Sequence, residues 1–467
     1  MKIDRTEENL LPDPRKRNAV KGGETRQRIL DAARSVFTRM PFRSASLRII
    51  AEEAGVRHPL LLHYFGSKTA LFDEVSEALE KEILESHPEF FEALRALPPE
   101  LRANFYLNGV VLQGFLHPAP YRLLLLNAAD AESPKTPGPG LFRMKKVQEK
   151  IIALARESLL GDALEDEASM LMLAFTLIVS QYVGAMAFHR NVLGLSAEDY
   201  KRWARETVVF LFEPLLREVS SGKAREAGAR QAALPQFSAL SASPLPGPPQ
   251  KRTRGEKARQ RILKAAKKVF SSHAYDEATI RMVGSAGSFD HSLIHHLYPS
   301  KDALFEAVAR QAYGDFIKAL GNWQAGLKGL PPDGIFRTLL QNGLEYCFEN
   351  RDTIGLLTRN TANYEIYEHL SGFVHMSKVH SGMLDMAVKN VPKGMDAPTP
   401  DLNRWLYSVV TAGYSLAGAP DYTAGLLGVA PNSDEYRAKV FRLLYFVFAP
   451  SAKNLSGGSK DGHPAKT

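Results

Sequence analysis

The chain has 467 residues, so two or more domains are expected, because one hydrophobic core stops growing below this length. Its 45% share of hydrophobic residues is ordinary for a globular protein, and the single cysteine, Cys347, excludes an internal disulfide framework. The net charge of +8 is concentrated, since residues 15–28 contain six Lys or Arg and residues 251–264 contain seven. Such clusters favour a polyanionic partner, although two solvated arms would have the same composition.

The first basic segment leads into a predicted helix-turn-helix. Apolar side chains in residues 29–37 recur at the spacing of an amphipathic helix. Residues 47–54 predict a second helix capped by Ser46, Gly55 suits the positive φ of a sharp turn, and residues 57–65 predict a third helix. In such a motif the helix after the turn enters the major groove of DNA, while the helix before it lies against phosphates.

The rest of the chain is also predicted to be helical. Ser67 is expected to cap the next helix, and no stretch shows the period-two alternation of strands. The uncharged residues 170–188 reach the lower length limit of a membrane span, but polar and small residues interrupt them, which favours a buried helix. The first 25 residues lack the apolar segment of a secretory signal, so a cytoplasmic protein without membrane contact is expected.

The same device occurs twice in the chain. Residues 26–75 align without a gap with residues 259–308 at an offset of 233, and 20 of the 50 positions are identical. Weaker similarities continue to the final segments of each half, which begin at Glu198 and Asp434. The repeating unit is therefore a domain-sized module and not a solenoid repeat. The proline-rich residues 220–250 between the modules predict a flexible linker.

The second copy is altered at its tightest turn. Ser288 stands where the first copy has Gly55, and Gly284 lies inside the preceding helix. A serine at positive φ costs on the order of 1 kcal/mol, and a mid-helix glycine costs a further ~0.5–1 kcal/mol. The second helix-turn-helix unit, called the second head below, is therefore expected to be less stable than the first. Asp290 replaces Arg57, and its carboxylate could cap the helix, accept from a cytosine amino group or repel phosphate. Either both heads bind unlike half-sites, which the second basic segment favours, or the second has partly lost DNA binding.

Three motifs of the first half resemble a known family. They are "TRQRILDAARSVF" from Thr25, "SLRIIAEEAGV" from Ser46 and "LLLHYFGSKTALF" from Leu60, and they are similar to the first helix, the helix-turn-helix and the start of the fourth helix of TetR/AcrR family regulators. The resemblance is specific over residues 22–80 and 255–313, and elsewhere rests on length and helical character. It implies an all-helical fold with a small DNA-binding head and a ligand-binding body that dimerises through its last two helices.

The resemblance also implies roles for individual residues, of two kinds. The positions that hold phosphates in the family correspond to Ser46, Tyr64, Lys68, Thr279 and Lys301. The positions of its reading helix correspond to Arg57, His58, His63, His291, Ser292 and His296. Arg48 and Arg281, which match between the copies, complete the candidate DNA-binding set. Leu62 and His295 replace a tyrosine that is usual in the family, which removes one expected phosphate contact from each head.

The bodies are expected to hold a pocket for a small, largely apolar effector. Aromatic residues at helical spacing are its candidate lining, although such stripes are more often ordinary core. These candidates are Phe105, Phe115, Tyr121, Phe175, Tyr182, Tyr346, Tyr364, Tyr367 and Tyr414. No catalytic residue, cofactor or metal site is predicted, because "GYSLA" from Gly413 lacks the last glycine of a nucleophile elbow and no acid or thiol completes a metal shell around His291, His295 and His296.

Together these features predict an all-α fold of two TetR-like modules packed as an intramolecular pseudo-dimer, with residues 166–190 and 199–216 against residues 402–419 and 434–449. The predicted function is a ligand-responsive repressor that reads an asymmetric, pseudo-palindromic operator on double-stranded DNA. The alternative is a small-molecule sensor that acts through protein contacts and whose DNA-binding function is partly or wholly vestigial, and a hydrolase is less favoured still. A further homodimer is left open. The expected segments are an arm (1–21), a first head (22–66) and body (67–219), a linker (220–253), a second head (254–299) and body (300–450), and a disordered tail (451–467).

Overall fold

The described part of the chain is helical throughout. The computed structural model describes residues 14–85, 88–129, 149–150, 153–160, 165–220, 253–323, 330–375, 378, 381–382 and 400–456. No strand occurs within these ranges, so the all-α prediction is confirmed. Nearly all of the predicted linker and most of the predicted tail lie outside the described residues.

The first half forms a three-helix head followed by a larger body. The head consists of α1 (Pro14–Arg39), α2 (Leu47–Glu53) and α3 (His58–Phe65). The body contains α4 (Lys68–Glu85), α5 (Pro88–Ala96), α6 (Pro99–Leu116), α7 (Ala119–Ala129), the π-helical turn η1 (Arg156–Leu160), α9 (Glu165–Gly184), α10 (Met186–Leu193) and α11 (Ala197–Ser220).

The second half repeats this order. Its head consists of α13 (Arg254–Ser272), α14 (Ile280–Gly287) and α15 (His291–Leu297). Its body contains α16 (Lys301–Trp323), α17 (Pro332–Glu349), α18 (Arg351–Tyr367), α20 (Pro400–Gly418), α21 (Pro420–Leu427) and α22 (Asp434–Ser456).

Two predicted boundaries differ from the structure. Helix α1 already begins at Pro14, inside the predicted arm, because the Lys, Arg and Ala residues there are good helix formers. Helix α22 continues to Ser456, beyond the predicted boundary at residue 450, although Pro450 removes one main-chain hydrogen bond. Ala449 and Ser451 on either side of this proline are buried, so packing holds the helix together there.

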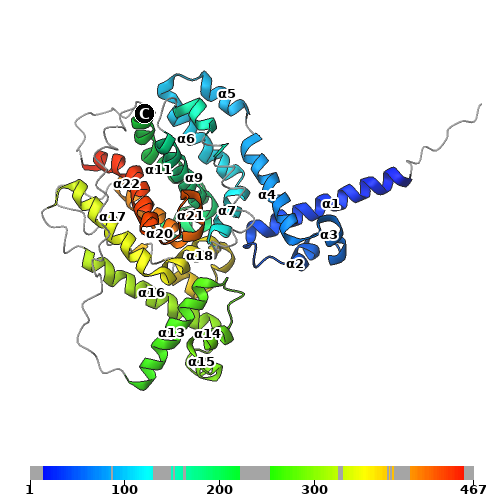
Figure 1. Cartoon of the computed structure of the whole chain (residues 1–467), viewed down its shortest axis with the longest axis vertical. Coiled ribbons are helices and arrows are strands. Elements are labelled where there is room, and N and C mark those ends of the chain that lie inside the picture. Colours follow the sequence, from blue (N-terminus) through cyan, green and yellow to red (C-terminus); the bar gives the residue numbers. More distant parts are fainter. Residues whose placement is uncertain are drawn as a thin grey trace, which may run out of the picture.

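Equivalent helices of the two halves pack against each other. Helix α7 contacts α18, α9 contacts α20, and α11 contacts α22, and each pair occupies the same place in its own half. Near the heads, Ser44 Oγ donates to Glu277 Oε1 at 2.9 Å, and these residues are 233 positions apart, which is the offset of the repeat. Equivalent positions can meet in this way only near an approximate twofold axis. The two heads lie at different edges of the molecule, with α9, α11, α20 and α22 between the outer helices (Figure 1).

Buried polar groups join the halves along this axis. The hydroxyl groups of Tyr182 and Ser408 lie 2.6 Å apart, and His189 Nδ1 lies 2.5 Å from the hydroxyl of Tyr407. The Trp203 ring packs edge-on against Tyr407, with ring centroids 5.2 Å apart. Because a buried polar group without a partner is costly, these pairs favour one register of the two halves over others.

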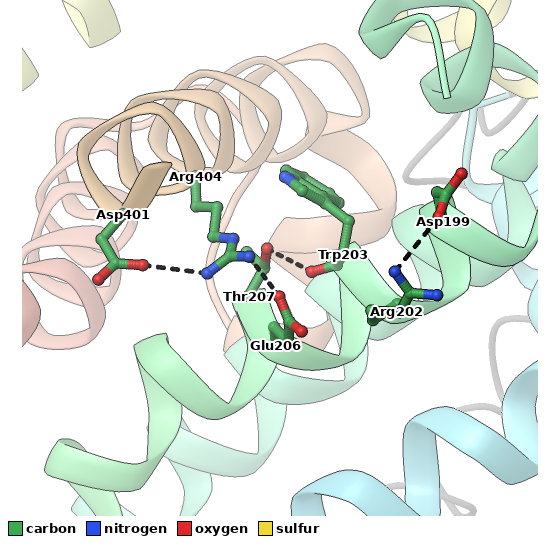
Figure 2. Close-up of polar contacts among 7 residues, drawn as sticks. All are labelled: Asp199, Arg202, Trp203, Glu206, Thr207, Asp401 and Arg404. Atoms are coloured by element: carbon green, nitrogen blue, oxygen red, sulfur yellow. Dashed lines mark hydrogen bonds and ion pairs between the residues drawn. The ribbon is translucent and has the colours of Figure 1, made fainter. Parts of the chain in front are cut away.

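An ion pair crosses the same interface at its edge. Arg404 of α20 pairs with Glu206 of α11, and its other amino group lies 3.0 Å from Asp401 on its own helix (Figure 2). The Arg404 side chain is only 20% exposed, whereas Arg202 nearby is 62% exposed and pairs with Asp199 within α11 at 3.3 Å. The Arg404–Glu206 pair therefore joins the two halves, whereas the Arg202–Asp199 pair lies within one helix.

Helix α9 is the one described helix that is long and apolar enough to cross a membrane. Its candidate window runs over Asp166–Gly184, and 72% of this window is buried by the rest of the chain. Packing against α7, α11, α20 and α22 accounts for its apolar composition, as the sequence analysis predicted for a buried helix.

We expect Glu206→Ala to loosen the contact between the halves. Arg404 would keep only Asp401 as a carboxylate partner, which costs about 1 kcal/mol for a half-buried pair and lowers the melting temperature by about 1 °C in a chain of this length. Thermal unfolding followed by circular dichroism measures the shift. Arg202→Ala is the matched control and leaves the melting temperature unchanged; an equal shift in both variants would show that Arg404 and Glu206 do not join the halves.

Candidate nucleic-acid interface

The first head buries one face of α3 and exposes the other. Leu61 and Phe65 of α3 are buried against Ile50 of α2 and Phe37 of α1. The side chains on the opposite face of the helix, between these buried positions, are exposed to solvent. The arrangement is that of a helix-turn-helix, in which the third helix of the head is free to enter a groove.

Local caps and a positive φ form the turn of the first head. Ser46 Oγ accepts from the main-chain N–H of Ile49 at 3.2 Å and caps α2. Gly55 takes φ +64° directly after this helix, as predicted. Arg57 precedes α3, and its side chain makes no capping hydrogen bond. Its guanidinium group therefore lies at the exposed start of the reading helix.

The second head uses the same plan with different residues. Thr279 Oγ1 accepts from Met282 N at 3.2 Å and caps α14. Ser288 takes φ 55° at the position of Gly55, so the predicted left-handed serine is confirmed. Asp290 caps α15, because its Oδ1 accepts from the main-chain N–H of Ser292 at 2.8 Å. This capping contact is the first of the three roles that the sequence left open for Asp290.

The glycines of α14 have a packing role that the sequence did not reveal. A Cβ at Gly284 would lie 2.9 Å from the carbonyl oxygen of Phe289, and a Cβ at Gly287 would lie 2.1 Å from the Phe289 ring. The first copy has Ala54 and Val56 where the second has Gly287 and Phe289. The larger aromatic ring thus fills the space that the missing methyl group leaves. The glycines weaken the helix, but they also make room for Phe289.

Electrostatics differ at the start of the two reading helices. The main-chain N–H of Ser292 stabilises the carboxylate of Asp290 and lowers its pKa below the usual value. Asp290 is therefore negatively charged at neutral pH, whereas Arg57, at the equivalent position of the first head, is positively charged. His291 Nδ1 lies 3.6 Å from the Asp290 carboxylate. One head presents a cation and the other an anion at the same position.

Lys68 and Lys301 donate hydrogen bonds to main-chain carbonyl oxygens of their own heads. Lys68 Nζ donates to the carbonyl oxygens of Phe42 and Ala45 at 2.9 and 3.0 Å. Lys301 Nζ donates to the carbonyl oxygen of Tyr275 at 2.9 Å and lies 4.2 Å from the centre of its ring. Burial lowers the pKa of both lysines. Each ties the start of α4 or α16 to the loop after the first helix of its head.

The remaining candidate DNA-binding residues share the outer surface of each head. Tyr64 is half-buried with its ring 5.6 Å from that of His63, and the others are exposed. The exposed set is Ser46, Arg48, Arg57, His58, His63, Thr279, Arg281, His291, Ser292 and His296. Leu60 and Leu293, equivalent residues of the two reading helices, are each 38% exposed and were missed. Each comes directly before a buried residue of its helix, Leu61 or Ile294, and this neighbouring position was the available signal. An exposed leucine there suits the methyl group of thymine.

Within the described residues, the predicted pocket residues make contacts in several different parts of the bodies. Phe105 is 37% exposed and stacks on Phe90, and Tyr367 donates to Asp276 of the second head. Phe175, Tyr346 and Tyr364 pack in separate aromatic contacts. Phe115 packs edge-on against Tyr200, Tyr121 lies beneath α9 beside Gly114, and the Tyr414 hydroxyl lies 3.3 Å from Thr361. Tyr182 alone among them lines the interface cavity described below.

Comparison with known proteins agrees with the geometry of the heads. A family model described as "Bacterial regulatory proteins, tetR family" matches residues 29–75 and 262–308. Over 81 residues, the chain is 30% identical to the HTH-type transcriptional regulator BetI of Vibrio atlanticus (strain LGP32). That alignment covers 17% of this chain and 40% of the relative, so the similarity spans less than half of the relative's length. The resemblance found in the sequence is thereby confirmed for both heads.

We expect Gly287→Ala to destabilise the second head, because its new methyl group would overlap the Phe289 ring. Overpacking of this kind costs about 1–3 kcal/mol. The double variant Gly287→Ala/Phe289→Val restores the pair found in the first copy and should recover most of the loss. Amide hydrogen exchange across α14 and α15 measures both effects. Gly255→Ala, where no atom lies within 4 Å of an added Cβ, is the control; a double variant no better than the single one would contradict the paired exchange.

Proposed function

We propose that this chain, which belongs to the tetR family of bacterial regulatory proteins, is a DNA-binding transcriptional regulator whose two heads act as a pair. The family model matches one segment in each head. The observation that carries this proposal is the exposed face of α3 and α15, each held by a complete helix-turn-helix. The packing of α7, α9 and α11 against their equivalents supports an intramolecular pseudo-dimer. Each head would place its reading helix in a major groove of double-stranded DNA.

The operator would be asymmetric. A homodimer presents identical heads to its two half-sites, whereas this chain can change one head without changing the other. Arg57 and Asp290 differ in charge at equivalent positions, and His63 and His296 lie in helices of different sequence. An arginine can donate to guanine and an aspartate can accept from cytosine, so the two heads would prefer different bases at the same place.

Regulation would follow from a shift between two arrangements of the heads. Helices α4 and α16 begin against their heads through Lys68 and Lys301. A small, largely apolar effector that binds the bodies more tightly in one arrangement would bias that arrangement and weaken operator binding. We propose a repressor of this kind, acting in the cytoplasm, that its effector releases from DNA.

A sensor with a vestigial second head is the second candidate. Asp290 supports it, because a carboxylate beside the sugar-phosphate backbone repels phosphate. The exposed Arg281 and the basic residues of α13 oppose it, since they keep a positive surface on the same head.

We expect binding to DNA upstream of the protein's own gene to fall steeply with salt. If the heads neutralise about six to ten phosphates, affinity drops by roughly 10³–10⁵ between about 50 and 200 mM salt. Arg48→Gln and Arg281→Gln are matched variants, one in each head, and each should reduce the slope of log affinity against log salt by about 1. A slope that changes only with Arg48→Gln would support the vestigial second head, and no binding at all would end the proposal.

We expect Arg57→Ala to weaken one half-site selectively, with a loss of about 1–3 kcal/mol if the arginine reads a guanine. Asp290→Asn is its counterpart in the second head, because asparagine keeps the cap but removes the negative charge, and it should strengthen the other half-site. Footprinting on an operator with separately randomised half-sites measures both effects. Equal changes on the two sides would contradict the division between the heads.

A further inference from the structure

A small cavity lies between the two halves, close to the approximate twofold axis. Its volume is about 40 Å³, and its walls come from α7 and α9 of the first half and from α18, α20, α21 and α22 of the second. Most of the lining is apolar, with Leu124 and Ile178 on one side and Ala412 and Val447 on the other. No charged side chain lines it, so an uncharged occupant is favoured, because a buried charge without a partner is costly.

Among the described residues, the walls contain one buried side-chain carbonyl oxygen that makes no hydrogen bond. The hydroxyls of Ser180, Ser408 and Ser415 donate to main-chain carbonyl oxygens four residues earlier in their own helices. Gln181 also lines the cavity and is only 8% exposed, and its Oε1 has no hydrogen-bond partner among the described residues. A buried carbonyl oxygen without a partner is costly, and a donor on a bound molecule would remove this cost.

The cavity is linked to the first head through α7. Leu124 faces the cavity, and the preceding residue, Leu123, is buried in the core of the first head. One turn further along, Asn127 Oδ1 accepts from the main-chain N–H of Phe42 at 3.0 Å. A shift of α7 away from the cavity would therefore move the first head.

Helix α18, the equivalent of α7, links the cavity to the second head. Thr358 lines the cavity, and the next residue, Arg359, donates from Nε to the carbonyl oxygen of Ser271 at 2.9 Å. Ser271 is close to the end of α13, the first helix of the second head. Each head is thus held by the helix that forms its side of the cavity wall.

We propose that this cavity is a shared effector site, placed between the halves, for a small uncharged molecule whose hydroxyl group donates to Gln181 Oε1. The site itself stands on the cavity and on Gln181, and only its effect on DNA binding rests on the proposed function. Its apolar walls hold the carbon skeleton of the ligand, and the unpaired carbonyl oxygen of Gln181 sets its orientation. One molecule would act on both heads, because both halves contribute walls.

The volume limits the ligand to a few heavy atoms. A cavity of about 150 Å³ holds benzene, and about 10–15 Å³ holds one water molecule, so 40 Å³ suits a short-chain alcohol. We therefore choose 2-propanol as the probe. Acetone is the matched comparison, because it has the same heavy-atom skeleton and no O–H group to donate.

Ligand-observed NMR on the full chain tests the site. We expect 2-propanol to bind at least about fivefold more tightly than acetone, and Gln181→Leu to abolish this preference, because the leucine cannot accept a hydrogen bond. Gln311→Leu, a change outside the cavity, is the control and leaves the preference intact. Equal binding of the two probes to the natural chain, or a preference that survives Gln181→Leu, would overturn the site.

The link to the heads is tested separately by DNA affinity. Ala412→Leu fills the cavity, so it should prevent binding of 2-propanol and, like the bound ligand, weaken DNA binding by about tenfold at fixed salt. If 2-propanol binds through Gln181 but neither it nor Ala412→Leu changes the affinity for DNA, the effector role is wrong and the site remains. If the natural chain does not bind DNA at all, the proposed function fails, and the NMR comparison alone decides the site.

Discussion

Helices α9 and α11 pack against α20 and α22 within one chain, and the placement of both heads depends on this packing. The buried pairs Tyr182–Ser408 and His189–Tyr407 make the contact specific, because a shifted register would leave these polar groups unpaired. A covalent connection between the halves replaces an association between separate molecules by an internal one at a high effective concentration. The interface therefore needs less affinity of its own than that of a dimer built from separate chains.

Duplication also relieves each head of the requirement to match the other. In the second head Phe289 and Gly287 changed together, so that a larger ring and a smaller neighbour still fill the same space. Ser288 accepts the strain of a positive φ, and the Asp290 cap offsets part of it at the start of α15. Such exchanges would occur in both heads of a homodimer, whereas here they occur in only one head.

The local features of the heads could be predicted from the sequence, and the long-range ones could not. The cap by Ser46 and the positive φ at positions 55 and 288 depend on a few neighbouring residues, and all three are found. The positions of Lys68 and Lys301 depend on a loop 23 to 26 residues away, so the sequence showed two basic residues and not their carbonyl partners. For the same reason, the aromatic stripes could not show which distant helix each ring contacts, as with Phe188 beside Tyr364.

The heads are attached to the bodies in different ways, and this difference bears on how they would respond. The core of the first head forms a cluster that takes in buried residues of α4, among them Leu71 and Phe72, and Leu123 of α7. In the second head, Tyr275 and Phe305 pack on Phe373, and the hydrophobic core continues without a break into the rest of the body. A displacement of α18 would carry the second head with it as one unit, whereas the first head would move with α4 and α7. Because the same shift at the interface produces unequal movements, the two heads would differ in their release from DNA as well as in the bases they read.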